Sequence, residues 1–229
     1  LVAVFAPVIA QYDPSAMDSS AILQNPNPVH WLGTDNYGRD TFARLVYGAR
    51  ISLIVGVLAV VLAAIIGISL GMIAGYFGGI IDLVIMRVME AMISIPRLML
   101  NLALVAVIGN SVTDLAVILA VSTVPTYVRM TRAMTLRVRN SDYVKAAKMT
   151  GASSFSILIN HILPNTISHN IVQMVSNVGG TILQESALSF LGVGISIPTP
   201  SWGTMVSEGR NYLMSNPAIA LVPGLCVAL

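Results

Sequence analysis

Charge is scarce in this sequence. Charged residues make up 10% of the 229 positions and hydrophobic residues 55%, whereas an average soluble domain carries about 25% charged residues. A chain folded in water needs more charge than this, so the composition predicts a polytopic membrane protein. The net charge of +2 is too small for an extended basic surface, and we expect no nucleic-acid partner.

Residues that carry catalysis or hold metals are also scarce. The single cysteine, Cys226, lies in an apolar run and excludes an internal disulfide and a cysteine-based metal site. The three histidines show no His-x-x-x-His spacing, so no metal site is expected. Neither a Gly-x-Ser-x-Gly elbow nor a phosphate-binding Gly-x-x-x-x-Gly-Lys-[Ser/Thr] loop is present. We therefore expect no enzyme, and no cofactor bound by this chain.

Apolar runs are what the sequence has in abundance. One stretch of 31 residues, 51–81, has no charged residue, and a membrane helix needs about 20. The pattern predicts an all-α membrane bundle with six transmembrane helices, which cover the end of a first helix at 1–10, then 51–81, 83–107, 113–129 and 167–191, and a sixth from about 217. Both terminal runs are too short to cross a bilayer, so we expect the first and last helices to be truncated.

The segments between these runs predict the orientation. Residues 11–50 are rich in Pro, Asn, Asp and Ser and end in an amphipathic helix at 40–50. Six of the twelve basic residues lie at 129–148, and the positive-inside rule places that segment in the cytoplasm. Counting helices from there places 11–50 outside. The transmembrane domain is expected at 51–229, with a cytoplasmic loop at 130–165.

A polar island at 141–164 is typical of a docking device for another protein. Small side chains and one aromatic recur at helical spacing on one face, at Tyr143, Ala146, Ala147 and Thr150. Gly151 breaks this helix. A second short helix ends at Pro164, which can neither donate a backbone hydrogen bond nor allow a regular turn before it. We expect two short helices joined by a glycine hinge.

Several polar side chains are predicted to lie inside the spans, where they are costly. They are Asn101, Gln173, Ser176, Asn177, Gln184 and Glu185. Residues 173, 177 and 184 share one helical face. Such a stripe is typical of a translocation path and also of hydrogen bonds between helices, and both readings stay open. Glu185 differs from the amides because it can carry a charge or pair with an arginine at a helix end.

The island has a defined motif spacing, Lys145-Ala146-Ala147, then Gly151, then His161-Ile162-Leu163-Pro164. This spacing resembles the cytoplasmic loop of binding-protein-dependent ABC importer permeases, although Lys145 replaces a Glu and His161 an Ile of that pattern. Further motifs resemble the C-type subunit of the dipeptide, oligopeptide and nickel branch, namely His30-Trp31-Leu32-Gly33-Thr34-Asp35 with Gly38-Arg39-Asp40, Ala74 to Gly79, Ser189 to Gly192, and Pro200 to Gly203.

This resemblance implies a type I ABC importer permease that crosses a bacterial inner membrane several times. Its implied partners, besides lipid, are a homologous second permease, two ABC ATPase subunits that bind ATP and Mg, and an extracytoplasmic substrate-binding protein. ATPase docking is then assigned to the island, at Tyr143, Lys145, Ala146, Ala147, Gly151 and Pro164. Contact with the binding protein is assigned to the outside residues Asp35, Arg39 and Trp202.

The transported substrate stays open at this point. Relatives in this branch carry dipeptides, oligopeptides, glutathione, nickel complexes or other metal chelates. The alternative function is an ion-gradient-driven secondary transporter or channel subunit, for which internal repeats are the expected mark, and we find no clear repeat. A purely structural scaffold would leave the polar stripe and the basic loop without a role.

Overall fold

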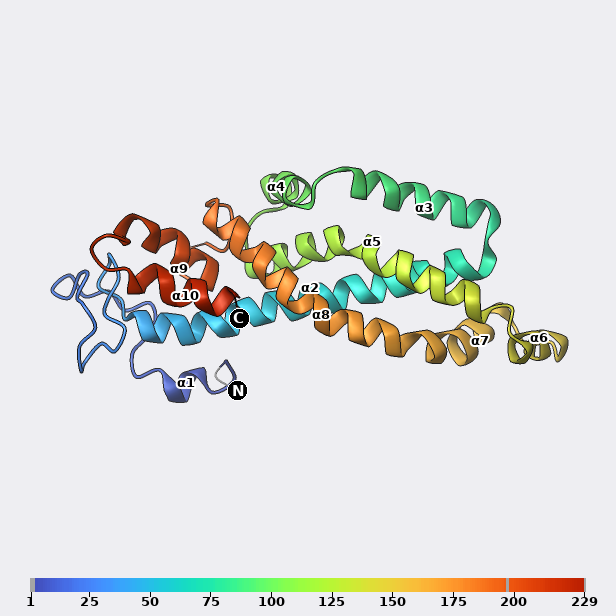
Figure 1. The fold of residues 1–229 in the computed structure, drawn as a ribbon, viewed down its shortest axis with the longest axis horizontal. Coiled ribbons are helices and arrows are strands. Elements are labelled where there is room, and N and C mark those ends of the chain that lie inside the picture. Colours follow the sequence, from blue (N-terminus) through green and yellow to red (C-terminus); the bar gives the residue numbers. More distant parts are fainter. Residues whose placement is uncertain (1–2, 197, 229) are drawn as a thin grey trace.

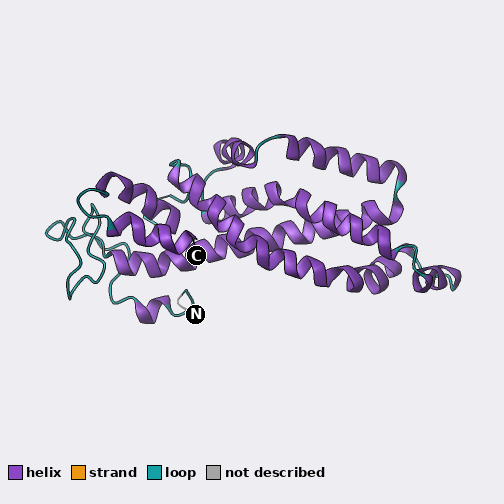
Figure 2. Ribbon diagram, viewed as in Figure 1, coloured by secondary structure: helices purple, strands orange, loops and turns teal. Residues whose placement is uncertain are grey.

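The computed structural model describes residues 3–196 and 198–228. Every regular element in these residues is a helix (Figure 2). The one strand-like feature among them is an isolated bridge between Thr34 and Asp40. The expected all-α class is therefore confirmed.

The molecule is elongated, with three long helices running side by side along it (Figure 1). They are α2 (Thr41–Phe77), α5 (Val112–Val138) and α8 (Leu163–Phe190). The short helix α6 (Asp142–Met149) projects alone at one end, which we call the α6 end. Helices α9 (Trp202–Gly209) and α10 (Ala218–Ala228) lie with the loop of residues 11–40 at the other, which we call the α9 end.

Glycines let α2 and α5 approach closely. A Cβ added to Gly71 would lie 2.7 Å from Thr131 Cβ, and one added to Gly67 would overlap Tyr127 Cβ. Neither position has room for a side chain. The small-xxx-small spacing of Gly67 and Gly71 in the sequence predicts such close packing, and the structure confirms it. The contact forms the centre of the apolar core, where Leu115, Ile118 and Leu119 are fully buried.

The amphipathic helix expected at 40–50 is the first part of α2, and no break separates it from the span. Asp40 caps this long helix by accepting a hydrogen bond from the Ala43 backbone N–H at 2.7 Å. The cap therefore sets the start of α2 within the loop that precedes the apolar run.

The prediction of a single helix at 83–107 is wrong. The chain forms α3 (Gly79–Ser94) and α4 (Arg97–Ile108), which meet at 94°. Pro96 lies in the break and has no N–H to continue the helix, and it also forces Ile95 into an extended conformation. The proline therefore turns the chain instead of only kinking it.

Two further helix boundaries differ from the expected ones. Helix α5 continues to Val138 instead of ending near Arg129, so much of the basic segment is helical. Pro164 does not end a helix, because α7 (Ser154–Ile157) passes through a π-helical turn, η1 (Leu158–Ile162), directly into α8. Proline is tolerated in the first turn of a helix, where its missing N–H is not needed.

Among the described residues, α2 and α5 are long and apolar enough to cross a membrane, and α3 with α4 makes a third span if the bent pair counts as one. Helix α8 has 28 residues, more than the roughly 20 required, and runs beside α2 and α5, but it is not apolar enough to be counted with these spans, so its assignment as a span stays a prediction. The terminal segments hold only α1 (Ala6–Ile9) and, after the short η2 (Arg210–Tyr212), the 11-residue α10. Their assignment to a first and sixth span stays a prediction.

Candidate functional site

Helix α6 is held on one side and uncovered on the other. Val144 is fully buried against the core, and Ala147 is partly buried beside it. At 3.6 residues per turn, Ala146 points almost opposite to Val144, and its side chain is exposed. Tyr143 and Met149 flank Ala146 on this open side and are 44% and 88% exposed.

The hinge expected at Gly151 is confirmed by its backbone. Gly151 has a φ of +83°, and no atom lies within 4 Å of an added Cβ, so the left-handed conformation alone selects glycine here. The Ala152 N–H then donates to the Ala147 carbonyl at 3.0 Å, which closes the end of α6. Ser153 caps α7 by accepting from the Ser156 N–H.

Beyond the hinge, Phe155 on α7 is 75% exposed. We call Tyr143, Ala146, Met149 and Phe155 together the tip surface. The sequence assigned docking to the first two of these but not to Met149 or Phe155. Large apolar residues inside a polar island were the signal that could have identified them, because exposed apolar side chains that gather in one patch mark an interaction site, whereas single ones do not.

Basic side chains fasten the end of α5 and helix α6 to the end of α2. The Arg139 guanidinium donates to the Gly75 carbonyl at 2.8 Å, and the Lys148 ammonium lies 4.9 Å from the centre of the Tyr76 ring. Lys145 takes no part in this contact and pairs with Asp142 at 3.4 Å. The residue that departs from the family motif is thus exposed and bound only to its own helix.

The predicted polar stripe forms contacts between helices. On α8, Gln173 donates to Asn177 at 3.0 Å, and Asn177 donates to the Tyr127 hydroxyl of α5 at 3.1 Å. Asn101 of α4 is fully buried and donates to Gln184 at 3.4 Å. These contacts match the interhelical reading of the stripe.

Glu185 is fully buried where α2, α8 and α9 meet. Its carboxylate accepts hydrogen bonds from Ser189 at 2.8 Å, from Ser201 at 3.0 Å and from Ser52 at 3.4 Å. Ser201 also caps α9, so Glu185 joins the three helices. Of the six predicted path residues, Ser176 differs, because its exposed hydroxyl donates only to the Val172 carbonyl of its own helix.

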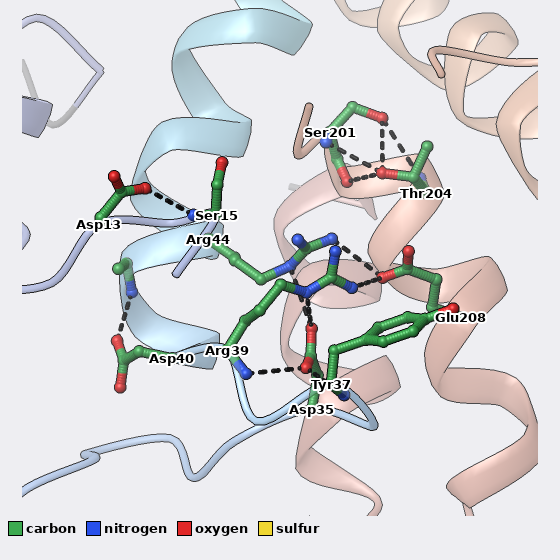
Figure 3. A network of polar contacts seen from close by, with 11 residues as sticks. Asp13, Ser15, Asp35, Tyr37, Arg39, Asp40, Arg44, Ser201, Thr204 and Glu208 are labelled. Carbon is green, nitrogen blue, oxygen red and sulfur yellow. Dashed lines mark hydrogen bonds and ion pairs between the residues drawn. The ribbon is translucent and has the colours of Figure 1, made fainter. Parts of the chain in front are cut away.

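Four charged residues at the α9 end form a buried ionic cluster of Asp35, Arg39, Arg44 and Glu208 (Figure 3). The Glu208 Oε2 atom accepts from Arg39 at 3.0 Å and from Arg44 at 2.9 Å, and Asp35 Oδ2 accepts from Arg39 at 2.6 Å. The cluster joins the loop before α2 to α9. Arg44 and Glu208 were missed at the sequence level, because they are far apart in the chain.

The ionic cluster includes two of the three residues predicted to contact a binding protein. Asp35 and Arg39 are 3% and 0% exposed, so their side chains are not available for direct contact with a binding protein. Trp202 is partly buried, packs next to Gly48 and donates its ring N–H to the Leu45 carbonyl at 3.1 Å. All three residues help to join α9 to the segment around the start of α2, and their contact with a binding protein stays a prediction.

The fold and these contacts define a class, a helical membrane protein in which polar side chains join the helices and one projecting helix exposes apolar side chains. Within the described residues, no group of three His, Cys, Asp or Glu side chains could hold a metal ion. The family model for the binding-protein-dependent transport system inner membrane component matches residues 67–229. The chain belongs to this family and is a permease subunit of an ABC importer, not itself an enzyme.

Curated relatives match along the whole chain. The dipeptide transport system permease protein DppC of Alkalihalophilus pseudofirmus is 41% identical over 100% of this chain and 75% of its own length. The probable D,D-dipeptide permease DdpC of Escherichia coli K12 is 40% identical over 100% and 77%. The glutathione permease GsiD of Escherichia coli O6:K15:H31 is 38% identical over 100% and 76%.

Among solved structures, the MetNI methionine ABC transporter in an inward-facing conformation is similar, with a TM-score of 0.63 and 17% identity. The match covers 81% of this chain and 88% of that one, and it shows a shared fold. Together, the comparisons support an ATP-driven importer permease over an ion-gradient-driven secondary transporter or channel.

Proposed function

We propose that this permease subunit imports dipeptides or related short peptides across a bacterial inner membrane, which it crosses several times. The α6 end lies in the cytoplasm and the α9 end outside. The positive-inside rule supports this orientation, since Arg137, Arg139, Lys145 and Lys148 gather at the α6 end.

The tip surface docks into an ATPase subunit in this proposal. The observation that carries it is the exposure of Tyr143, Met149 and Phe155 around Ala146 on a helix that projects from the bundle. A small residue between larger apolar ones lets a groove close around the helix, as when an amphipathic helix binds a hydrophobic groove. Gly151 and Pro164 set the direction of the docking segment without touching the partner themselves.

The family implies an ATPase partner and a binding protein in general. We propose the full assembly to contain two ATPase subunits, a homologous second permease and one extracytoplasmic binding protein. ATP and Mg bind on the ATPase subunits, because this sequence has no phosphate-binding loop. Asp35, Arg39 and Trp202 then act on the binding protein only through the loop that they hold.

The substrate proposal follows from the relatives, two of which are named for dipeptides and one for glutathione. All of these are short peptides or peptide derivatives. Nickel or another metal chelate is the second candidate, because a chelated ion needs no protein ligands of its own. The path residues Asn101, Gln173, Ser176, Asn177, Gln184 and Glu185 shape the path by positioning helices, with Ser176 the one candidate for direct contact.

Transport by the reconstituted complex tests the proposal. Proteoliposomes with both permeases, the ATPases and the binding protein should accumulate a labelled dipeptide when ATP is supplied. They should not do so with a proton gradient alone. Uptake driven by the gradient without ATP would contradict the proposed energy source, and ATP-driven uptake of a nickel chelate but not of dipeptides would contradict the proposed substrate.

A further inference from the structure

A cavity of about 600 Å³ lies where the break between α3 and α4 faces the middle of α5. Its size falls in the range of roughly 300–1,000 Å³ that is typical of small-molecule sites. Apolar walls come from α3 and Pro96, and the polar lining comes from Arg97, Ser122, Thr126 and Arg129. None of these polar residues belongs to the predicted path or to the docking surface.

The break places a positive charge at this cavity. Helix α4 starts at Arg97, and the Arg97 guanidinium donates to the Thr126 hydroxyl on α5 at 3.0 Å. No side chain caps the N-terminus of α4, and no acidic residue lies in its first turn. The free N–H groups and the helix dipole therefore add to the positive charge of Arg97.

Neither arginine of the cavity has an acidic partner within the described residues. Arg129 makes no ion pair or side-chain hydrogen bond there, and Arg97 uses one of its five N–H donors. The nearby acids are engaged, Glu90 with Arg87 and Asp82 with Arg132. Two arginines thus share a cavity that no carboxylate in the described part of the chain neutralises.

Both arginines are exposed in this subunit and line the cavity. Arg129 is also the first of the basic residues at 129–148. At the end of a span, an arginine without an acidic partner faces a water-filled cavity or an anionic group. A guanidinium pairs best with a planar, two-oxygen anion, which makes a carboxylate the matching group.

We propose that Arg97 and Arg129 form a subsite that binds the carboxylate of the substrate during its passage through the membrane. This inference rests on the proposed function, because a peptide carries a free C-terminal carboxylate and apolar side chains that fit the remaining walls. Ser122 and Thr126 supply hydroxyls beside the bound group. The phosphate of a lipid headgroup has similar chemistry, and the test separates the two.

The experiment compares uptake of alanyl-alanine and of its C-terminal amide by the complete reconstituted transporter. Arg97→Gln and Arg129→Gln should each lower uptake of the free acid at least tenfold and leave uptake of the amide unchanged. The same binding protein is used in every sample, so its own preference for acid or amide cancels when each variant is compared with the wild type. Arg137→Gln, an exposed arginine on the same helix outside the cavity, should change neither rate.

Equal loss of acid and amide uptake, or no loss of either, would overturn the subsite. If the selective loss of acid uptake disappears in vesicles made only of phosphatidylcholine, the arginines bind anionic lipid. That result would also overturn the proposed subsite. Should the Gln variants fail to assemble, Arg97→Lys and Arg129→Lys decide, because they keep the charge but lose two-point binding and should still lower uptake of the acid selectively. Absence of ATP-driven uptake in the wild type would instead reject the proposed function.

Discussion

The two ends of the molecule treat charged and apolar groups in opposite ways. At the α9 end, four charged side chains are buried and paired within the chain, with Arg39 and Arg44 at 0% and 2% exposure. At the α6 end, Met149 and Phe155 are 88% and 75% exposed. The α9 end therefore pairs its buried charges within this subunit, whereas the α6 end exposes apolar side chains on a projecting helix.

The difference separates a region that holds the subunit together from a region that is open to another protein. A buried ionic cluster costs desolvation and is stable only with its partners in place, so it holds the loop, α2 and α9 as one body. An exposed apolar surface gains free energy when another protein covers it. We therefore expect substitutions at the α9 end to act on stability, and substitutions at the tip surface to act on coupling.

The largest effect is expected for Glu208→Ala. It leaves two buried guanidinium groups without their shared carboxylate, which typically costs about 3–5 kcal/mol. The thermal midpoint of the purified transporter should fall strongly. Glu90→Ala is the matched control, because Glu90 belongs to an exposed pair with Arg87 worth only about 0.2–1 kcal/mol. Equal shifts in both variants would mean that the cluster does not hold the α9 end together.

Ala146→Arg is expected to separate coupling from stability. A long charged side chain at the centre of the tip surface obstructs docking, so ATP-driven uptake should fall at least about tenfold, or ~1.4 kcal/mol. The thermal midpoint should not change. Ala147→Arg should lower both, because Ala147 is partly buried, and Ala146→Ser should lower neither. Normal uptake by Ala146→Arg would remove Ala146 from the docking face.

Gly151→Ala tests whether the backbone conformation of Gly151 is needed for uptake. Its φ of +83° costs an L-residue about 1–2 kcal/mol, which should disturb the direction of α7 and reduce uptake. Gly151→Asn should retain more uptake, because Asn tolerates this conformation better than Ala. The same uptake assay ranks the two variants, and an Ala variant equal to wild type would show that the hinge has no such strain.

The smallest effect is expected for Lys145→Ala. The Lys145 side chain is 62% exposed and pairs only with Asp142, a contact of about 0.2–1 kcal/mol. The thermal midpoint should hardly move, and uptake should fall less than about fivefold. A much larger loss of uptake with unchanged stability would place Lys145 in direct contact with the ATPase.

Much of the fold could be predicted because its signals are local in the chain. The uncharged run at 51–81 predicts a span, and Gly67 with Gly71 predicts close packing, whatever the rest of the chain does. The break at Pro96 was harder to predict, because a membrane helix tolerates proline when neighbouring helices satisfy its backbone. Sequence alone cannot state whether such neighbours exist.

The docking segment and the ionic cluster show the same distinction between local signals and tertiary packing. Sequence by itself determined the two short helices around Gly151, the motif spacing and the membrane composition, because each depends on residues a few positions apart. Only the tertiary structure decided that Arg39 and Arg44 meet Glu208, that Glu185 joins three helices and that Ala146 is open while Val144 is buried. The physical reason is that burial and ion pairing depend on which distant segments pack together, and no local spacing specifies that packing.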